Sequence, residues 1–175
     1  MTAPAMTAPA GPLDPIDLRI LVALQRDGRL TNQKLAEAVG LSPSPCLARV
    51  KRLQKRGLIR GYGARLDLDG LVGPVHVVTE FTLKDHGRED FARFERAISG
   101  VPFAMEALLM SGGYDYLVRF VVRDLGHYQD VVEDLIGREA GIARYFSYVV
   151  IKRVHERAEI PLTELLAVTP SRQTR

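Results

Sequence analysis

Residues 42–57 read SPSPCLARVKRLQKRG, and this stretch decides the fold of the N-terminal part of the chain. The pattern predicts a helix that begins at Ser42 and Pro43 and ends at Arg56, before Gly57. Proline fits the first turn of a helix, where backbone amides have no partner within the helix, and glycine is a frequent helix stop. At about 100° per residue, the apolar side chains fall on one arc that is expected to pack inward. They are Cys46, Leu47, Val50 and Leu53.

The opposite side of this helix is small at its start and basic at its end. It is centred on Ser44, Pro45, Ala48, Arg52 and Lys55, with Arg49, Lys51 and Arg56 at its flanks. Such a face suits a helix in the major groove of DNA, because small side chains approach base edges and basic ones meet phosphates. We expect Arg49 and Arg52 to be the best base readers, since a guanidinium can bind O6 and N7 of guanine together. Lys51, Lys55 and Arg56 are expected to contact the backbone, and a solvated surface charge is the alternative for each residue.

Two helices are predicted before this one. Helical spacing runs from Asp14 to Gly28, and a second helix spans about 32–39 after Thr31 as its cap. The link between the second and third helices is only Gly40 and Leu41, so a helix-turn-helix or an αα-corner is expected over residues 13–60. The candidate DNA contacts are Thr31, Asn32, Ser42, Ser44, Pro45, Ala48, Arg49, Lys51, Arg52, Lys55 and Arg56.

The charge is divided unevenly along the chain. Residues 1–60 hold ten Lys or Arg and four acids, a net charge of +6, whereas the remaining residues hold 14 basic and 17 acidic side chains, or −3. This asymmetry favours contact between the N-terminal part and a polyanion such as double-stranded DNA. From charge alone, a solvated charged face is the alternative.

The pattern changes after the third helix. Residues 58–67 predict a short strand, and the glycines and proline in 61–74 predict a linker. Strand-like and helical segments then follow over 75–83, 88–99, 103–110, 114–122, 124–137 and 142–151. The order βαββαβ predicts an α+β chain with a ferredoxin-like domain over 75–152, whose two helices cover one sheet face. The other face has no predicted cover, so dimerisation through the sheets is expected.

Other features limit the function classes. Residues 1–12 repeat MTAPA and are expected to be a disordered tail, and the tail 153–175 has one weakly helical stretch that the pattern does not place. No apolar run approaches about 18 residues and no secretory signal is visible, so a cytoplasmic protein without a membrane partner is expected. Scattered histidines, the single Cys46 and the lack of nucleotide or nucleophile motifs disfavour an enzyme, a metal or a cofactor.

The stretch LDPIDLRILVALQRDGRLTNQKLAEAVGLSPSPCLARVKRLQKRGLIRGYGARLD (residues 13–67) and SGGYDYL (residues 111–117) resemble regulators of the Lrp/AsnC family. The resemblance covers about residues 13–152. It implies a winged helix-turn-helix with Ser42 to Lys55 as recognition helix, and a strand around Tyr62–Asp67 that pairs with a partner chain. It also implies a homodimer that assembles further into tetramers, octamers or rings around which DNA wraps.

The same resemblance implies a small effector, usually an amino acid, between effector domains beside the turn at 112–116. The implied contacts are Leu108, Met110, Ser111, Gly112, Gly113, Tyr114, Asp115 and Ser147. The family usually has an acidic or polar residue at the place of Gly113, so one polar contact is missing here. Asp115 is the candidate for the effector ammonium, with a structural pair to Arg119 or Arg123 as the alternative. Ser147 keeps the hydroxyl of a family threonine, or is a plain strand serine.

Leu108 and Met110 would give this effector site an apolar lining. The hypothesis is therefore an apolar or aromatic amino acid, or its metabolite, that changes DNA affinity by binding one arrangement of subunits more tightly. An architectural protein with largely nonspecific DNA binding is the alternative function, because ferredoxin-like domains serve many purposes.

Overall fold

The computed structural model describes residues 13–167, so the predicted tail at 1–12 and the end of the C-terminal tail lie outside the described residues. The described chain divides into two compact units. One unit spans 66–154, and the other joins 13–65 to 155–167. In the described part of the chain, no helix is long and apolar enough to cross a membrane.

Three helices build the N-terminal unit: α1 (Pro15–Arg26), α2 (Asn32–Val39) and α3 (Pro43–Lys55). Their ends follow the capping rules, because the Asp14 and Thr31 side chains accept backbone amides and Gly40 ends α2 in the left-handed region at φ 73°. The buried core consists of Ile20, Leu35, Ala36, Val39, Cys46 and Leu53. The prediction for Leu47 is wrong: its side chain is 42% exposed, since α3 buries a narrower arc than its apolar pattern suggests.

The predicted strand at 58–67 is absent from the described chain. These residues are irregular up to α4 (Leu68–Leu71), where the Asp67 side chain accepts the Gly70 amide. A strand needs a neighbour to complete its hydrogen-bond ladder, and within residues 13–167 no other segment pairs with these residues as a strand. The alternation of residue types at 58–67 therefore predicted a strand that these residues do not form within one chain.

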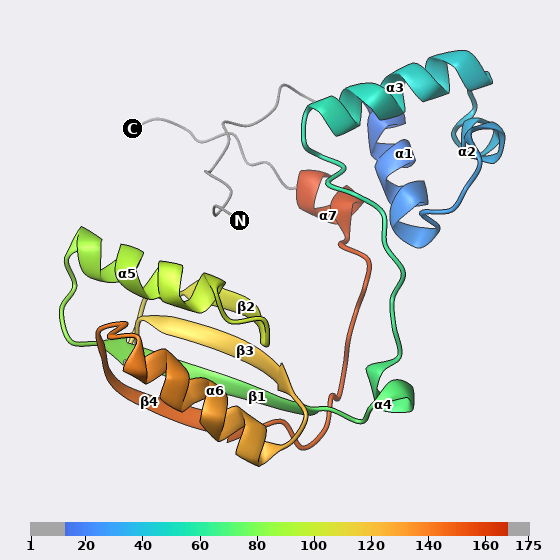
Figure 1. The fold of residues 1–175 in the computed structure, drawn as a ribbon. Helices are drawn as coiled ribbons and strands as arrows, with labels where there is room; N and C mark the ends of the chain where they lie inside the picture. Colours follow the sequence, from blue (N-terminus) through green and yellow to red (C-terminus); the bar gives the residue numbers. More distant parts are fainter. Residues whose placement is uncertain (1–12, 168–175) are drawn as a thin grey trace. The chain divides into compact units, whose positions relative to one another are not determined.

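The second unit is a four-stranded antiparallel sheet with two helices. Its strands are β1 (Val75–Leu83), β2 (Ala104–Leu109), β3 (Tyr116–Val122) and β4 (Ile142–Val149), in the order β2-β3-β1-β4. Helix α5 (Arg88–Ser99) precedes β2, and α6 (Leu125–Gly137) precedes β4 (Figure 1). This βαββαβ order and antiparallel sheet confirm the α+β, ferredoxin-like prediction.

The core of this unit lies between the helices and one face of the sheet. Alternate residues of β1 and β3, among them Phe81 and Phe120, are fully buried and cluster with Phe94 of α5 and Leu135 of α6. The other face has no helix over it within this unit (Figure 1). On it, Leu108 of β2 lies beside Leu117, while Glu80 pairs with Phe146 of β4. Phe146 is 55% exposed, so the face is left partly apolar.

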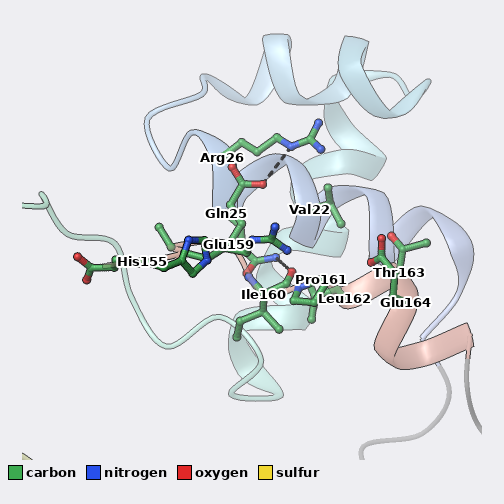
Figure 2. Close-up of a pocket in the computed structure, with 13 residues that line it drawn as sticks. Val22, Gln25, Arg26, His155, Glu159, Ile160, Pro161, Leu162, Thr163 and Glu164 are labelled. Atoms are coloured by element: carbon green, nitrogen blue, oxygen red, sulfur yellow. Dashed lines mark hydrogen bonds and ion pairs between the residues drawn. The ribbon is translucent and has the colours of Figure 1, made fainter. Parts of the chain in front are cut away.

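The C-terminal segment 155–167, which the sequence pattern did not place, packs on helix α1. The Gln25 amide donates to the Ile160 carbonyl at 3.3 Å and accepts from the Ile160 amide at 2.9 Å. Arg26 forms an ion pair with Glu159 at 3.4 Å, as Figure 2 shows. Helix α7 (Leu162–Ala167) follows these contacts. This segment is therefore part of the N-terminal unit and not a separate tail.

Candidate DNA interface and effector site

Helix α3 presents the expected small and basic side chains to solvent. Ser42, Ser44, Pro45, Ala48, Lys51, Arg52 and Lys55 are exposed, whereas Arg49 and Arg56 are partly buried. Cys46 and Leu53 anchor the opposite side of the helix in the core. The structure thus brings a small N-terminal patch and two exposed lysines onto one outward side of the helix.

Arg49 and Arg52 are held by two aspartates of α1. Asp17 accepts hydrogen bonds from Arg49 at 2.9 Å, and from Nη2 of Arg52 at 2.8 and 2.6 Å through its two carboxylate oxygens. Asp14 also bonds Arg49 and lies 3.8 Å from Arg52. The bond from Arg49 lowers the pKa of the Asp14 carboxyl, and the two carboxylates raise the pKa of the Arg49 guanidinium.

This cluster concerns the two arginines that were predicted to read bases, a role that stays a prediction for both. The Arg49 side chain is one-quarter exposed and is bonded to both aspartates, so a base-reading role would require those bonds to break. The Arg52 side chain remains 50% exposed although Asp17 holds its Nη2. Sequence reasoning missed Asp17. The available signal was its spacing of three from Asp14, which matches the spacing of the two arginines.

Thr31 and Asn32 have structural contacts. The Thr31 hydroxyl caps α2 by accepting the Lys34 amide at 3.3 Å, and the Asn32 side chain donates to the Pro43 carbonyl at 2.8 Å. The second bond fixes the start of α3 relative to α2. Their role as DNA contacts stays a prediction.

The turn at 111–115 connects β2 and β3 and is stabilised by Asp115. Its backbone bonds Phe81 at 2.9 Å and Met110 at 2.8 Å, and its carboxylate accepts the Leu83 amide at 2.8 Å. The ring of His86 lies 3.1 Å from the same carboxylate. The predicted structural partners are different, because Arg119 pairs with Glu106 and Arg123 with Asp124.

The remaining residues of this turn are available to a ligand. Ser111, Gly112 and Gly113 are exposed, and the added volume of a Cβ at either glycine would meet no atom within 4 Å. Tyr114 is half-buried, and Leu108 and Met110 are 43% and 38% exposed. The turn therefore presents open backbone and an apolar rim.

Ser147 lies far from this turn in the sheet. Its hydroxyl bonds the Tyr128 hydroxyl of α6, which also bonds Thr79 at 2.7 Å. Burial raises the pKa of the Tyr128 phenol. Ser147 is on the helix-covered face of edge strand β4, whereas Leu108 is on the open face of the other edge strand, β2. One chain does not bring them into one pocket.

The comparisons identify both units. Residues 13–60 match the model for winged helix-turn-helix DNA-binding, and residues 76–160 match the Lrp/AsnC ligand binding domain. The chain belongs to the Lrp/AsnC family of transcriptional regulators. It is 48% identical to transcriptional regulatory protein DoeX of Halomonas elongata, over 81% of this chain and 90% of that protein. It is 40% identical to a leucine-responsive regulatory protein of Haemophilus influenzae, over 82% and 87%.

A solved structure of a transcriptional regulator supports the fold assignment as well. The complex of a Neisseria meningitidis transcriptional regulator with L-Met has 30% identity and a TM-score of 0.79, covering 88% of this chain and 99% of that one. The family makes the chain a DNA-binding regulator with a ligand-binding domain. These relatives are named as regulators rather than enzymes, and within residues 13–167 no group of three His, Cys, Asp or Glu could hold a metal ion.

Proposed function

We propose that this Lrp/AsnC-family protein is a sequence-specific regulator whose DNA affinity depends on an apolar or aromatic amino acid, or its metabolite. The effector binds beside the turn at 111–115, between copies of the chain. The observation that carries the DNA part is the outward side of α3, with small residues at its start and Lys51 and Lys55 at its end. A DNA partner implies a cytoplasmic location in a bacterial-type cell.

The lining of the turn supports an apolar effector. Leu108 and Met110 border it, and Gly113 offers no side chain for a polar contact. The Asp115 side chain is 16% exposed; its carboxylate accepts the Leu83 amide and contacts His86, and its remaining lone pairs can accept the ammonium of an amino acid. Two relatives have names that refer to leucine or L-Met, which are apolar amino acids.

The sheet supports assembly of at least a homodimer. Its uncovered face carries exposed Leu108, Phe146 and Tyr148 on its two edge strands, and exposed apolar side chains of this size favour cover by another surface. Two polar contacts lie on that face: Arg119 pairs with Glu106, and the Tyr148 hydroxyl donates to the Glu80 carboxylate at 3.4 Å. We propose that a second copy covers this face, and we extend the proposal to tetramers or octamers of such dimers.

Thermal unfolding of the full chain against each of the twenty amino acids tests the effector. At about a hundredfold over its dissociation constant, a true effector should stabilise the protein by roughly 2.7 kcal/mol and raise the midpoint clearly. We expect the rise with an apolar or aromatic amino acid. A rise only with an acidic or basic one would contradict the proposed chemistry, and Asp115→Asn should remove the ligand-dependent part alone.

Architectural, nonspecific DNA binding is the alternative, and the bonded state of Arg49 favours it, because fewer free guanidinium groups remain to read bases. Binding to a duplex selected from a random library and to a scrambled duplex separates the two functions. Equal affinity at every salt concentration would identify nonspecific phosphate binding.

A further inference from the structure

The carboxylate of Asp17 has an unusual place for a charged group. Its side chain is 1% exposed, yet it lies directly under the helix that faces DNA. A buried carboxylate is stable only when charged and hydrogen-bonded partners replace water. Here the partners are Arg49 and Arg52 of α3, which lie 32 and 35 residues away in sequence.

The cluster consists of two aspartates from the start of α1 that face two arginines of α3. Asp14 and Asp17 are three residues apart at the start of α1, and Arg49 and Arg52 are three residues apart on α3, so each pair projects from one side of its helix. The positive end of the α1 dipole further stabilises the two aspartates. The cluster contains two negative and two positive groups, and it therefore adds no net charge to the DNA-facing unit.

The two arginines differ in what they can still do. Arg49 is turned toward α1, with its side chain one-quarter exposed, whereas Arg52 is half exposed and lies on the same side of α3 as Ala48 and Lys55. Asp17 holds only Nη2 of Arg52 in its bonds. An arginine fixed in this way loses less side-chain entropy when it binds a base than a free one does.

We propose that Asp17 is a positioning residue for DNA recognition. It fixes Arg52 in the orientation that reads a base, and it keeps Arg49 from acting as an additional phosphate-binding charge. Affinity for any DNA then comes mainly from the exposed lysines, and discrimination between sequences comes from Arg52. This inference rests on the proposed sequence-specific function.

The test compares full-length wild type with Asp17→Asn on two duplexes: one selected by the wild type from a random library, and a scrambled one. The asparagine is nearly isosteric but removes the carboxylate charge that Arg52 bonds, and it leaves Arg49 with Asp14 as its remaining carboxylate partner. We expect the Asp17→Asn variant to bind the scrambled duplex as tightly as the wild type or more tightly. Its affinity should fall more steeply with salt concentration, by the amount that about one additional phosphate contact gives. We expect binding of the selected duplex to weaken, so that the ratio of the two affinities falls about tenfold or more.

Two further variants keep the test decisive if Asp17→Asn folds poorly. Asp14→Asn is the matched control, because it makes the same charge change at the start of the same helix, asparagine still caps that helix, and both bonds from Nη2 of Arg52 to Asp17 remain. It should keep the affinity ratio. Arg52→Gln should lower binding of the selected duplex about tenfold to a hundredfold and change the scrambled duplex little.

The outcomes separate the two proposals. If Asp17→Asn and Arg52→Gln change both affinities by the same factor or leave them unchanged, the positioning role is refuted while specific binding by the wild type stands. If the wild type enriches no sequence from the library, the specific function itself is refuted and the positioning role with it.

Discussion

Replacing Tyr128 by phenylalanine removes the hydroxyl that joins Thr79 of β1 to Ser147 of β4. The Thr79 side chain is 0% exposed, so water cannot replace the lost partner. An unsatisfied buried hydroxyl costs about 1–3 kcal/mol, and we expect the free energy of unfolding to fall by about that amount. For a chain of this length, each kcal/mol corresponds to about 2–4 °C in the thermal midpoint, so the expected loss is several degrees.

A double-mutant cycle identifies the cause of this loss. Tyr128→Phe leaves the Thr79 hydroxyl without its partner, and Thr79→Val removes that hydroxyl. Thr79→Val should therefore lower the free energy of unfolding by about 1 kcal/mol less in the Tyr128→Phe variant than in the wild type. Urea denaturation of the full chain, followed by circular dichroism, gives the four free energies. Ser147→Ala is the control with a partly exposed hydroxyl and should cost least. Additive effects of Thr79→Val and Tyr128→Phe, within about 0.5 kcal/mol, would refute the coupled hydroxyl cluster.

Three more predictions follow from single contacts. The pKa of Asp14 is lower in the folded chain than its value of about 3.9 in the unfolded chain. The stability that this gives is present above that unfolded pKa and is lost as the pH falls through the folded pKa. Asp14→Asn should therefore make the free energy of unfolding depend less on pH below about pH 4. An unchanged profile would contradict this ion pair. Cys46 is fully buried and burial raises the pKa of its thiol, so a disulfide reagent at pH 8 should label it only after denaturant is added. Gln25→Ala removes both bonds to Ile160 and should increase hydrogen exchange over 155–167 while leaving exchange in β1 unchanged; equal protection would contradict docking of this segment.

Local signals predicted the helices well because their causes are local. Asp14, Thr31 and Gly40 act within a few residues of themselves, and the structure has the expected cap at each. The sheet could be predicted from the order of the strand-like and helical segments, because few compact folds have the order βαββαβ. Both parts of the fold could therefore be read without knowledge of distant contacts.

The errors concern contacts between elements. A helical projection shows which side of α3 is polar, but it cannot show that Asp17 of another helix lies beside that side and bonds Arg49. Leu47 was assigned to the core by the same projection and is exposed, because only part of an apolar arc meets α1 and α2. The docking of 155–167 on Gln25 had no sequence signal of its own, since backbone and amide groups recognise each other without a characteristic pattern.

The placement of the predicted effector residues has a consequence for the proposed regulation. Leu108 and Ser147 lie on opposite edges and opposite faces of one sheet, so a ligand that touches both must lie between two chains. Such a ligand binds an assembled state more tightly than a separated one, and by linkage it stabilises that assembly by the same factor. Each chain of the proposed assembly contributes one helix α3. An effector can therefore change DNA affinity without contacting the DNA-binding unit, provided that its affinity differs between the assemblies.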